Sequence, residues 1–134
     1  MTDRYVLPLR TALASNTGGP YTHAWDRVPV VGDGTIRGVW ATARSIASNT
    51  FTNKVDIYYQ ADAPAAGSNT ATSVLTTPIT LVNDRDSADG TVSQAGARVA
   101  SGGVLELRTY TGNTAAQPSF LDLSAVVEIE RDPD

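Results

Sequence analysis

The feature that most constrains the fold is a row of alternating apolar residues near the end of the sequence. Every second position from 121 to 129 is apolar, and the intervening positions are polar except for Val126. A shorter row precedes it, in which Leu105, Leu107 and Thr109 share one side. Because successive side chains of a strand point to opposite faces, each row predicts a strand with one face on a core.

The rest of the sequence also predicts strands. No window of eleven or more residues has the apolar spacing of a helix. Segment 35–46 predicts a long strand, 54–60 a further strand, 71–82 a strand kinked or interrupted at Pro78, and 91–93 and 98–100 short strands, with turns between them. In 35–46 we expect Val39, Ala41 and Ala43 on one side, and Ile36, Trp40 and Ile46 on the other. We therefore predict an all-β fold, a single jelly-roll-like antiparallel β-sandwich of about eight strands, over residues 35–134.

Residues 1–34 form a separate part of this prediction. Segments 4–10 and 23–31 are extended but contain Pro8 and Pro29, which excludes them from the centre of a sheet. Two alternatives remain, an N-terminal arm on a neighbouring subunit or an added edge hairpin, and we favour the arm. Its apolar residues are the expected partner-binding residues: Tyr5, Leu7, Leu9 and Trp25.

Composition excludes several classes of function. The 134 residues carry a net charge of −4 with scattered cations, which argues against nucleic acid as a partner. No apolar run approaches the length of a membrane span, and no signal peptide is recognisable at the N-terminus. With no cysteine there is no disulfide framework, thiol nucleophile or thiolate metal site.

Candidate catalytic groups are few. The single histidine, His23, has Asp26 nearby as an orienting group, but this pairing is too general to indicate catalysis. The acidic segment 84–90 fails the calcium-loop spacing, although Asp84, Asp86 and Asp89 leave a looser cation site open. The glutamates at 106, 128 and 130 are expected to face solvent, with Glu106 and Glu128 as cross-strand neighbours. We predict no enzymatic activity and no cofactor, and keep a sandwich-fold hydrolase as a weaker alternative.

Five stretches resemble virion proteins of tailed phages: 36–43 (IRGVWATA), 55–58 (VDIY), 73–81 (SVLTTPITL), 99–107 (VASGGVLEL) and 121–129 (LDLSAVVEI). Together they are similar to the jelly-roll module of capsid decoration (cement) proteins and of head or tail fibre domains. The resemblance covers roughly residues 35 to 131, and it rests on strand patterns rather than on catalytic motifs. Residues 1–34 match nothing in the family.

The resemblance implies a capsid decoration protein. Such a protein would be made in the host cytoplasm, bind the major capsid protein on the outer surface of the phage head, and stabilise capsomer contacts as a homotrimer. The alternative is a carbohydrate-binding jelly roll of a phage fibre or adhesin, which would bind a glycan through exposed aromatic residues such as Tyr58 and Tyr110.

Overall fold

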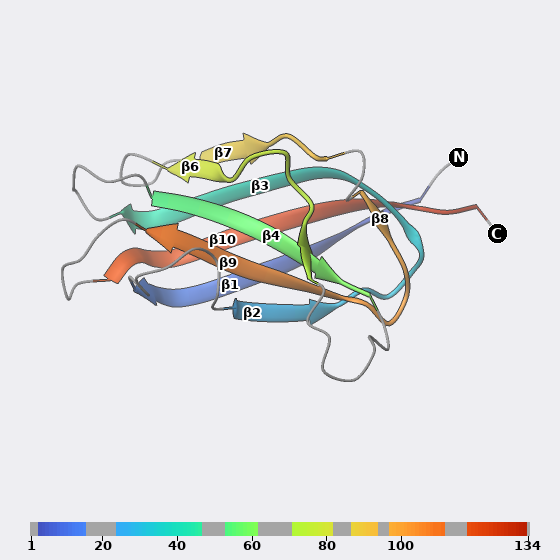
Figure 1. Cartoon of the computed structure of the whole chain (residues 1–134), viewed down its shortest axis with the longest axis horizontal. Coiled ribbons are helices and arrows are strands. Elements are labelled where there is room, and N and C mark those ends of the chain that lie inside the picture. Colours follow the sequence, from blue (N-terminus) through green and yellow to red (C-terminus); the bar gives the residue numbers. More distant parts are fainter. Residues whose placement is uncertain are drawn as a thin grey trace.

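The strands of this protein form two packed antiparallel sheets (Figure 1). The computed structural model describes residues 3–15, 24–46, 53–61, 71–81, 87–93, 97–111 and 118–133. The first sheet, called the β10 sheet, contains β1 (Arg4–Ser15), β10 (Pro118–Arg131), β3 (Gly34–Ile46), β7 (Ser87–Gly90) and β8 (Arg98–Val99). The second, called the β9 sheet, contains β2 (Ala24–Pro29), β9 (Val104–Thr111), β4 (Asn53–Gln60), β5 (Thr72–Ser73) and β6 (Ile79–Leu81).

The pairing of these strands is nested. The first strand pairs with the last, β2 pairs with β9, β3 pairs with β7 and β8, and β4 pairs with β5 and β6. Two further pairings, β10 with β3 and β9 with β4, join the nested pairs into the two sheets. This is the connectivity of a jelly roll in which two of the eight strands are each split in two. The predicted fold class is confirmed.

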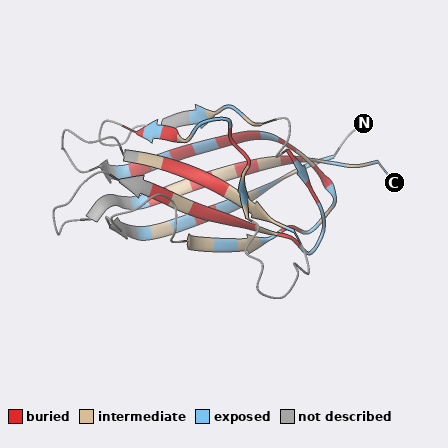
Figure 2. Cartoon of the chain, viewed as in Figure 1, coloured by how far each residue is buried: buried red, intermediate tan, exposed pale blue. Residues whose placement is uncertain are grey.

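The core lies between the sheets and is built from the alternating rows. Along each long strand, buried and more exposed residues alternate (Figure 2). The predicted rows of β9 and β10 supply much of the core, with the buried residues Leu105, Leu107, Leu123, Ala125, Val127 and Ile129. Burial of each of the larger side chains contributes about 1.5–3 kcal/mol to folding. Because side chains alternate along a strand, burial of these rows also fixes which residues of β9 and β10 lie on the outer faces of the two sheets.

A β-bulge in β3 corrects one prediction. Gly38 pairs with Glu128, but the next residue of β10, Ile129, pairs with Ile36, so Arg37 is an extra residue in β3. The bulge shifts the alternation by one position. Ile36 is therefore buried in the core together with Val39, whereas its expected place was beside Trp40 on the opposite face.

The described residues of segment 1–34 belong to the sandwich. β1 lies along β10 from Arg4 to Ser15, and β2 lies along β9, so each is the edge strand of one sheet. These strands do not form a detached arm, because their apolar side chains complete the core of their own chain. The acidic segment also differs from the expected loop, since its last four residues form β7.

Candidate functional site

The strongest candidate for a contact surface is the outer face of the β10 sheet. Pairing places Pro8 of β1, Val126 of β10 and Trp40 of β3 side by side in one row across this face. Val6 lies in the next row of β1. Val6 is 56% exposed and Trp40 is 43% exposed, which is unusual for large apolar side chains. We call Val6, Pro8, Val126 and Trp40 the Trp40 patch.

A glycine holds the Trp40 ring in place. A Cβ atom added at Gly38 would lie 2.4 Å from Cη2 of Trp40, so the indole rests directly against the backbone of Gly38. Gly38 is buried although it lies on the outer face of the strand. The end of the indole ring therefore occupies the space that a side chain at Gly38 would fill, and Trp40 as a whole remains 43% exposed.

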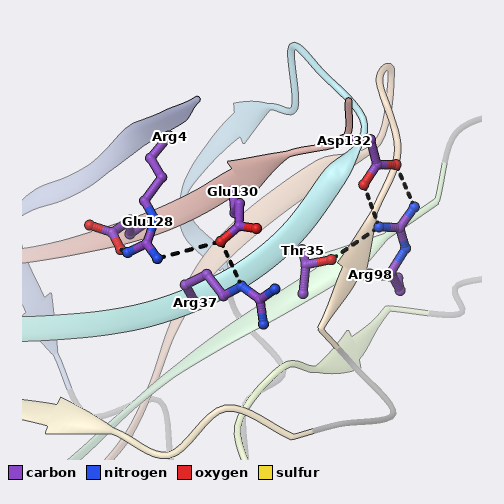
Figure 3. A network of polar contacts seen from close by, with 7 residues as sticks. All are labelled: Arg4, Thr35, Arg37, Arg98, Glu128, Glu130 and Asp132. Carbon is purple, nitrogen blue, oxygen red and sulfur yellow. Dashed lines mark hydrogen bonds and ion pairs between the residues drawn. The ribbon is translucent and has the colours of Figure 1, made fainter. Parts of the chain in front are cut away.

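Charged side chains border the Trp40 patch at one end, where Glu128 pairs with Val6. Figure 3 shows these charged residues and the contacts among them. Arg4 contacts Glu128 at 2.7 Å and Glu130 at 3.4 Å, and Arg37 contacts the same oxygen of Glu130 at 3.1 Å. Glu130 thus joins an arginine of β1 to an arginine of β3. Exposed pairs of this kind contribute little individually, about 0–1 kcal/mol, but they fix the orientation of the charges.

The next pair along this border is formed by Arg98 and Asp132 (Figure 3). Arg98 donates two hydrogen bonds of 2.7 Å to the two oxygens of Asp132, and a third of 3.0 Å to Thr35. The hydrogen bonds from Arg98 lower the pKa of the Asp132 carboxyl. This pair ties the chain after β10 to β8.

The charges of the outer face are arranged by strand. β1 carries arginines, β10 carries carboxylates, and β3 carries arginines again; the described residues of this set are Arg4, Arg10, Asp122, Glu128, Glu130, Arg37 and Arg44. Asp122 and Arg44 form an ion pair at the opposite end of the face from Glu130. The centre of the face is therefore apolar on β1, β10 and β3, with the exposed Asp89 of β7 beside Trp40, and charge alternates from strand to strand toward both ends.

The outer face of the β9 sheet carries a buried ionic cluster instead. Glu106 is only 4% exposed and is bound by Arg27 at 2.8 Å and by Arg108 at 2.5 Å. The Arg108 guanidinium also lies 4.2 Å from the centre of the Tyr58 ring. The prediction of a solvent-facing Glu106 is therefore wrong. Glu106 and Glu128 are not neighbours either, because β9 and β10 belong to different sheets.

Asp56 is the second buried carboxylate of this cluster, at 2% exposed. It accepts hydrogen bonds from the Ser73 hydroxyl at 2.6 Å and from the Ile57 N–H at 2.8 Å. Burial raises the pKa of Asp56, while the hydrogen bonds from Ser73 and Ile57 and the charge of Arg108 oppose that rise. The carboxylate holds β5 against β4, which is a structural role.

A shallow depression lies between the turn that joins β2 to β3, the turn that joins β8 to β9, and the end of β10. It has a volume of about 360 Å³ and is lined by Gly32, Asp33, Ser101, Arg131, Asp132 and Pro133. Its polar groups are already engaged: Asp33 accepts the Ser101 N–H at 2.8 Å, and Arg131 lies 5.1 Å from the Tyr5 ring centre. Within the described ranges no three histidine, cysteine or acidic side chains are grouped to hold a metal ion.

The predicted contact residues occupy different depths. Leu9 is 0% exposed inside the core of its own chain, so a partner contact through Leu9 is contradicted. Tyr5, Leu7 and Trp25 are partly buried against the same core. Tyr5 donates a hydrogen bond to the Gly32 carbonyl at 2.7 Å, and Trp25 donates one to Thr109 at 2.7 Å. Burial raises the pKa of the Tyr5 hydroxyl.

Asp26 has a role that the sequence did not indicate. Its carboxylate accepts hydrogen bonds from the backbone N–H of Arg10 at 2.7 Å and of Arg27 at 2.9 Å. His23, Asp84, Asp86 and the side chain of Tyr110 lie outside the described residues, and Asp89 is exposed on β7. No helix in the described part of the chain has the length and apolar character needed to cross a membrane.

Comparison with known proteins adds one finding about the fold. No family model and no curated protein matches the sequence. Among solved structures, the capsid of Ralstonia phage GP4 contains a similar chain, with a TM-score of 0.57 and 9% sequence identity. The similarity covers 98% of this chain and 86% of that chain. The jelly-roll sandwich described above, including β1 and β2, is therefore a fold that also occurs in a phage capsid.

Proposed function

We propose that this protein is a structural protein of a phage virion, a decoration (cement) protein that binds the outer surface of the head and stabilises contacts between capsomers. The observation that carries the proposal is the fold similarity to a phage capsid chain along nearly the whole sequence. The resemblance of five sequence stretches to decoration proteins points the same way. Under this proposal the partner is the major capsid protein and the location is the capsid surface.

The physical character of the molecule supports a passive binding role. Each long strand of the sandwich is paired along one or both sides, and the core is continuous between the sheets. The charged groups that are buried in the described residues, Asp56 and Glu106, are engaged in hydrogen bonds or ion pairs within the chain. Such a module provides a rigid surface rather than a reacting group.

The proposed contact side for the capsid is the side formed by β1 and β2. Tyr5, Leu7 and Trp25 retain partial exposure there, and Pro29 is exposed on β2. We further propose that three copies assemble as a homotrimer. The carbohydrate-binding alternative has less support, because the Tyr58 ring is already covered on one side by Arg108.

The test is a binding experiment with expanded, undecorated heads assembled from the major capsid protein of the same phage. We expect the purified protein to co-sediment with the heads to a saturating ratio and to raise the temperature at which they disassemble. Heads that neither retain the protein nor gain stability would contradict the proposal.

The contact side is tested separately with single thiols, since the chain has no cysteine. In the variant Pro29→Cys, we expect bound heads to protect the thiol from maleimide labelling. The matched control is Thr80→Cys, at an exposed position on β6 near the opposite edge of the same sheet, which should stay reactive. Protection of the control thiol instead would move the contact to the β6 side.

A further inference from the structure

We propose that the outer face of the β10 sheet binds the same face of a second copy of this chain, around a two-fold axis that runs parallel to the strands between β10 and β3. Rotation about this axis keeps each residue at its height along the strands and exchanges β10 with β3. The β10 strand of one copy then lies over β3 of the other. This inference concerns self-association and does not depend on binding to a capsid.

The charges of the face favour this arrangement. At one end, Asp122 lies level with Arg44, and at the other, Glu130 lies next to Arg37 and forms an ion pair with it. After the rotation, the carboxylates of β10 in each copy lie opposite the arginines of β3 in the other. Both ends of the contact are therefore complementary, and the complementarity is present twice by symmetry.

The apolar centre fits the same axis. Val126 and Trp40 are paired across β10 and β3, so the rotation places Val126 of each copy over Trp40 of the other. In the next row, Ser124 of β10 comes over Thr42 of β3. A central tryptophan surrounded by arginines and carboxylates has the composition of a protein contact, with an apolar centre and a polar rim.

The same charges disfavour the other in-plane axis. A two-fold axis perpendicular to the strands would place β10 over β10, with Asp122 of one copy opposite Glu130 of the other. It would likewise bring Arg44 over Arg37. Like charges across a contact cost free energy, so the alternation of charge between strands selects the parallel axis.

The axis is tested by cross-linking two singly substituted chains. Stacked sheets lie about 10 Å apart, so a bismaleimide of about that length can join thiols across the contact. We expect a mixture of Pro8→Cys and Asp89→Cys to give a covalent dimer, because the rotation places Pro8 of β1 over Asp89 of β7. Each variant alone should give much less, because the two copies of the same residue lie three strand spacings apart across the face in addition to the gap between the sheets. A mixture of Pro8→Cys with Thr80→Cys is the control and should give no more than Pro8→Cys alone, because Thr80 lies on the other sheet. Efficient cross-linking of Pro8→Cys alone would overturn the proposal, because only the axis perpendicular to the strands places Pro8 of one copy over Pro8 of the other.

The role of the Trp40 patch is tested by sedimentation of the purified protein over a range of concentrations. We expect Trp40→Ser to weaken the association at least tenfold, and Val31→Ser to leave it unchanged. Val31 is a matched control because it is also apolar and exposed, but lies outside this face. Val126→Glu provides a second variant if Trp40→Ser folds poorly. The inference would be contradicted by the absence, up to millimolar concentration, of a species with twice the mass of the smallest one. It would also be contradicted by patch variants that both associate as strongly as the wild type.

Discussion

Asp56 and Glu106 show how two carboxylates can be buried on the outer face of a sheet. An ionised carboxylate loses much hydration when it is covered, and this cost is tolerable only when hydrogen bonds or a counter-charge replace the water. Glu106 has two arginines for this purpose, and its burial is matched by charge. Asp56 relies mainly on Ser73 and the backbone, with Arg108 nearby, so its pKa is raised overall.

The raised pKa predicts a pH effect for Asp56→Asn. Above the ordinary aspartate pKa of 3.8, the folded protein holds the Asp56 proton more tightly than the unfolded chain does. The contribution of Asp56 to the free energy of unfolding is therefore full below pH 3.8 and declines as the pH rises through the raised pKa. Asparagine does not titrate and can still accept the hydrogen bonds from Ser73 and Ile57. The free energy of unfolding of the wild type minus that of Asp56→Asn, measured with urea, should fall across this range.

Asp132→Asn provides a control of opposite sign. The Asp132 pKa is lowered by Arg98, so the wild type should gain stability relative to Asp132→Asn as the pH rises toward 3.8, and keep it above that value. A difference for Asp56→Asn that is independent of pH would show that its carboxyl titrates alike in the folded and unfolded states.

At this scale, the sequence predicted alternation well and side-chain environment poorly. The buried rows of β9 and β10 follow from periodicity alone. The position of Ile36 could not be predicted from periodicity, because the extra residue Arg37 reverses the alternation in β3. No sequence pattern marked this bulge. The burial of Glu106 depends on Arg27, which is distant in sequence and reaches it from another strand. Likewise, in the sequence Val126 is only an apolar residue among the polar positions of its strand. Its place in an apolar patch could not be predicted, because its neighbours Pro8 and Trp40 come from other strands.

At the scale of elements, the free edge of β1 is protected against pairing with another strand. The Arg10 N–H points away from β10, because it binds Asp26 of β2. Because backbone amide groups alternate in direction along a strand, the amide nitrogen of residue 8 also faces away from β10. Residue 8 is a proline, whose nitrogen carries no hydrogen to donate. Two successive outward positions of the edge therefore cannot donate to an added strand. The sequence indicated an edge position from Pro8 but gave no sign of the contribution of Asp26.

Asp26→Ala should open this edge. The Arg10 N–H then loses its acceptor, which should lower the free energy of unfolding by about 1 kcal/mol. The freed edge should also associate through backbone hydrogen bonds, seen as increased light scattering under mildly destabilising conditions. Asp26→Asn keeps one acceptor oxygen and should show an intermediate effect. Equal stability and scattering for Asp26→Ala and the wild type would contradict the role assigned to this carboxylate.

At the scale of the molecule, the nested pairing makes the first strand part of the core. The number and approximate position of most strands could be predicted from alternation and turns. Which strand pairs with which could not, because the pairing of β1 with β10 joins the two ends of the chain. Pro8 and Pro29 suggested an arm, whereas both are tolerated in this fold because β1 and β2 are edge strands.

Deletion of residues 1–15 distinguishes an arm from a core strand. The deletion removes β1 with Leu9 and uncovers one edge of β10. We expect the truncated chain to lose its cooperative thermal unfolding transition and its near-ultraviolet circular dichroism. Addition of a synthetic peptide of residues 4–15 should restore both signals by occupying the vacant edge. A truncated chain that unfolds at the wild-type temperature would show that β1 is dispensable.

The position of β10 also has a consequence for synthesis on the ribosome. β10 lies between β1 and β3 in its sheet, yet it is the last of the described strands to be translated. Until it emerges, β1 has no partner and β3 lacks the neighbour with which it makes its longest pairing. The nascent chain must therefore wait, with much of its core uncovered, until the last of these strands has emerged. This sheet can fold only after the last of its described strands has been made, and until then the uncovered apolar residues expose the chain to aggregation.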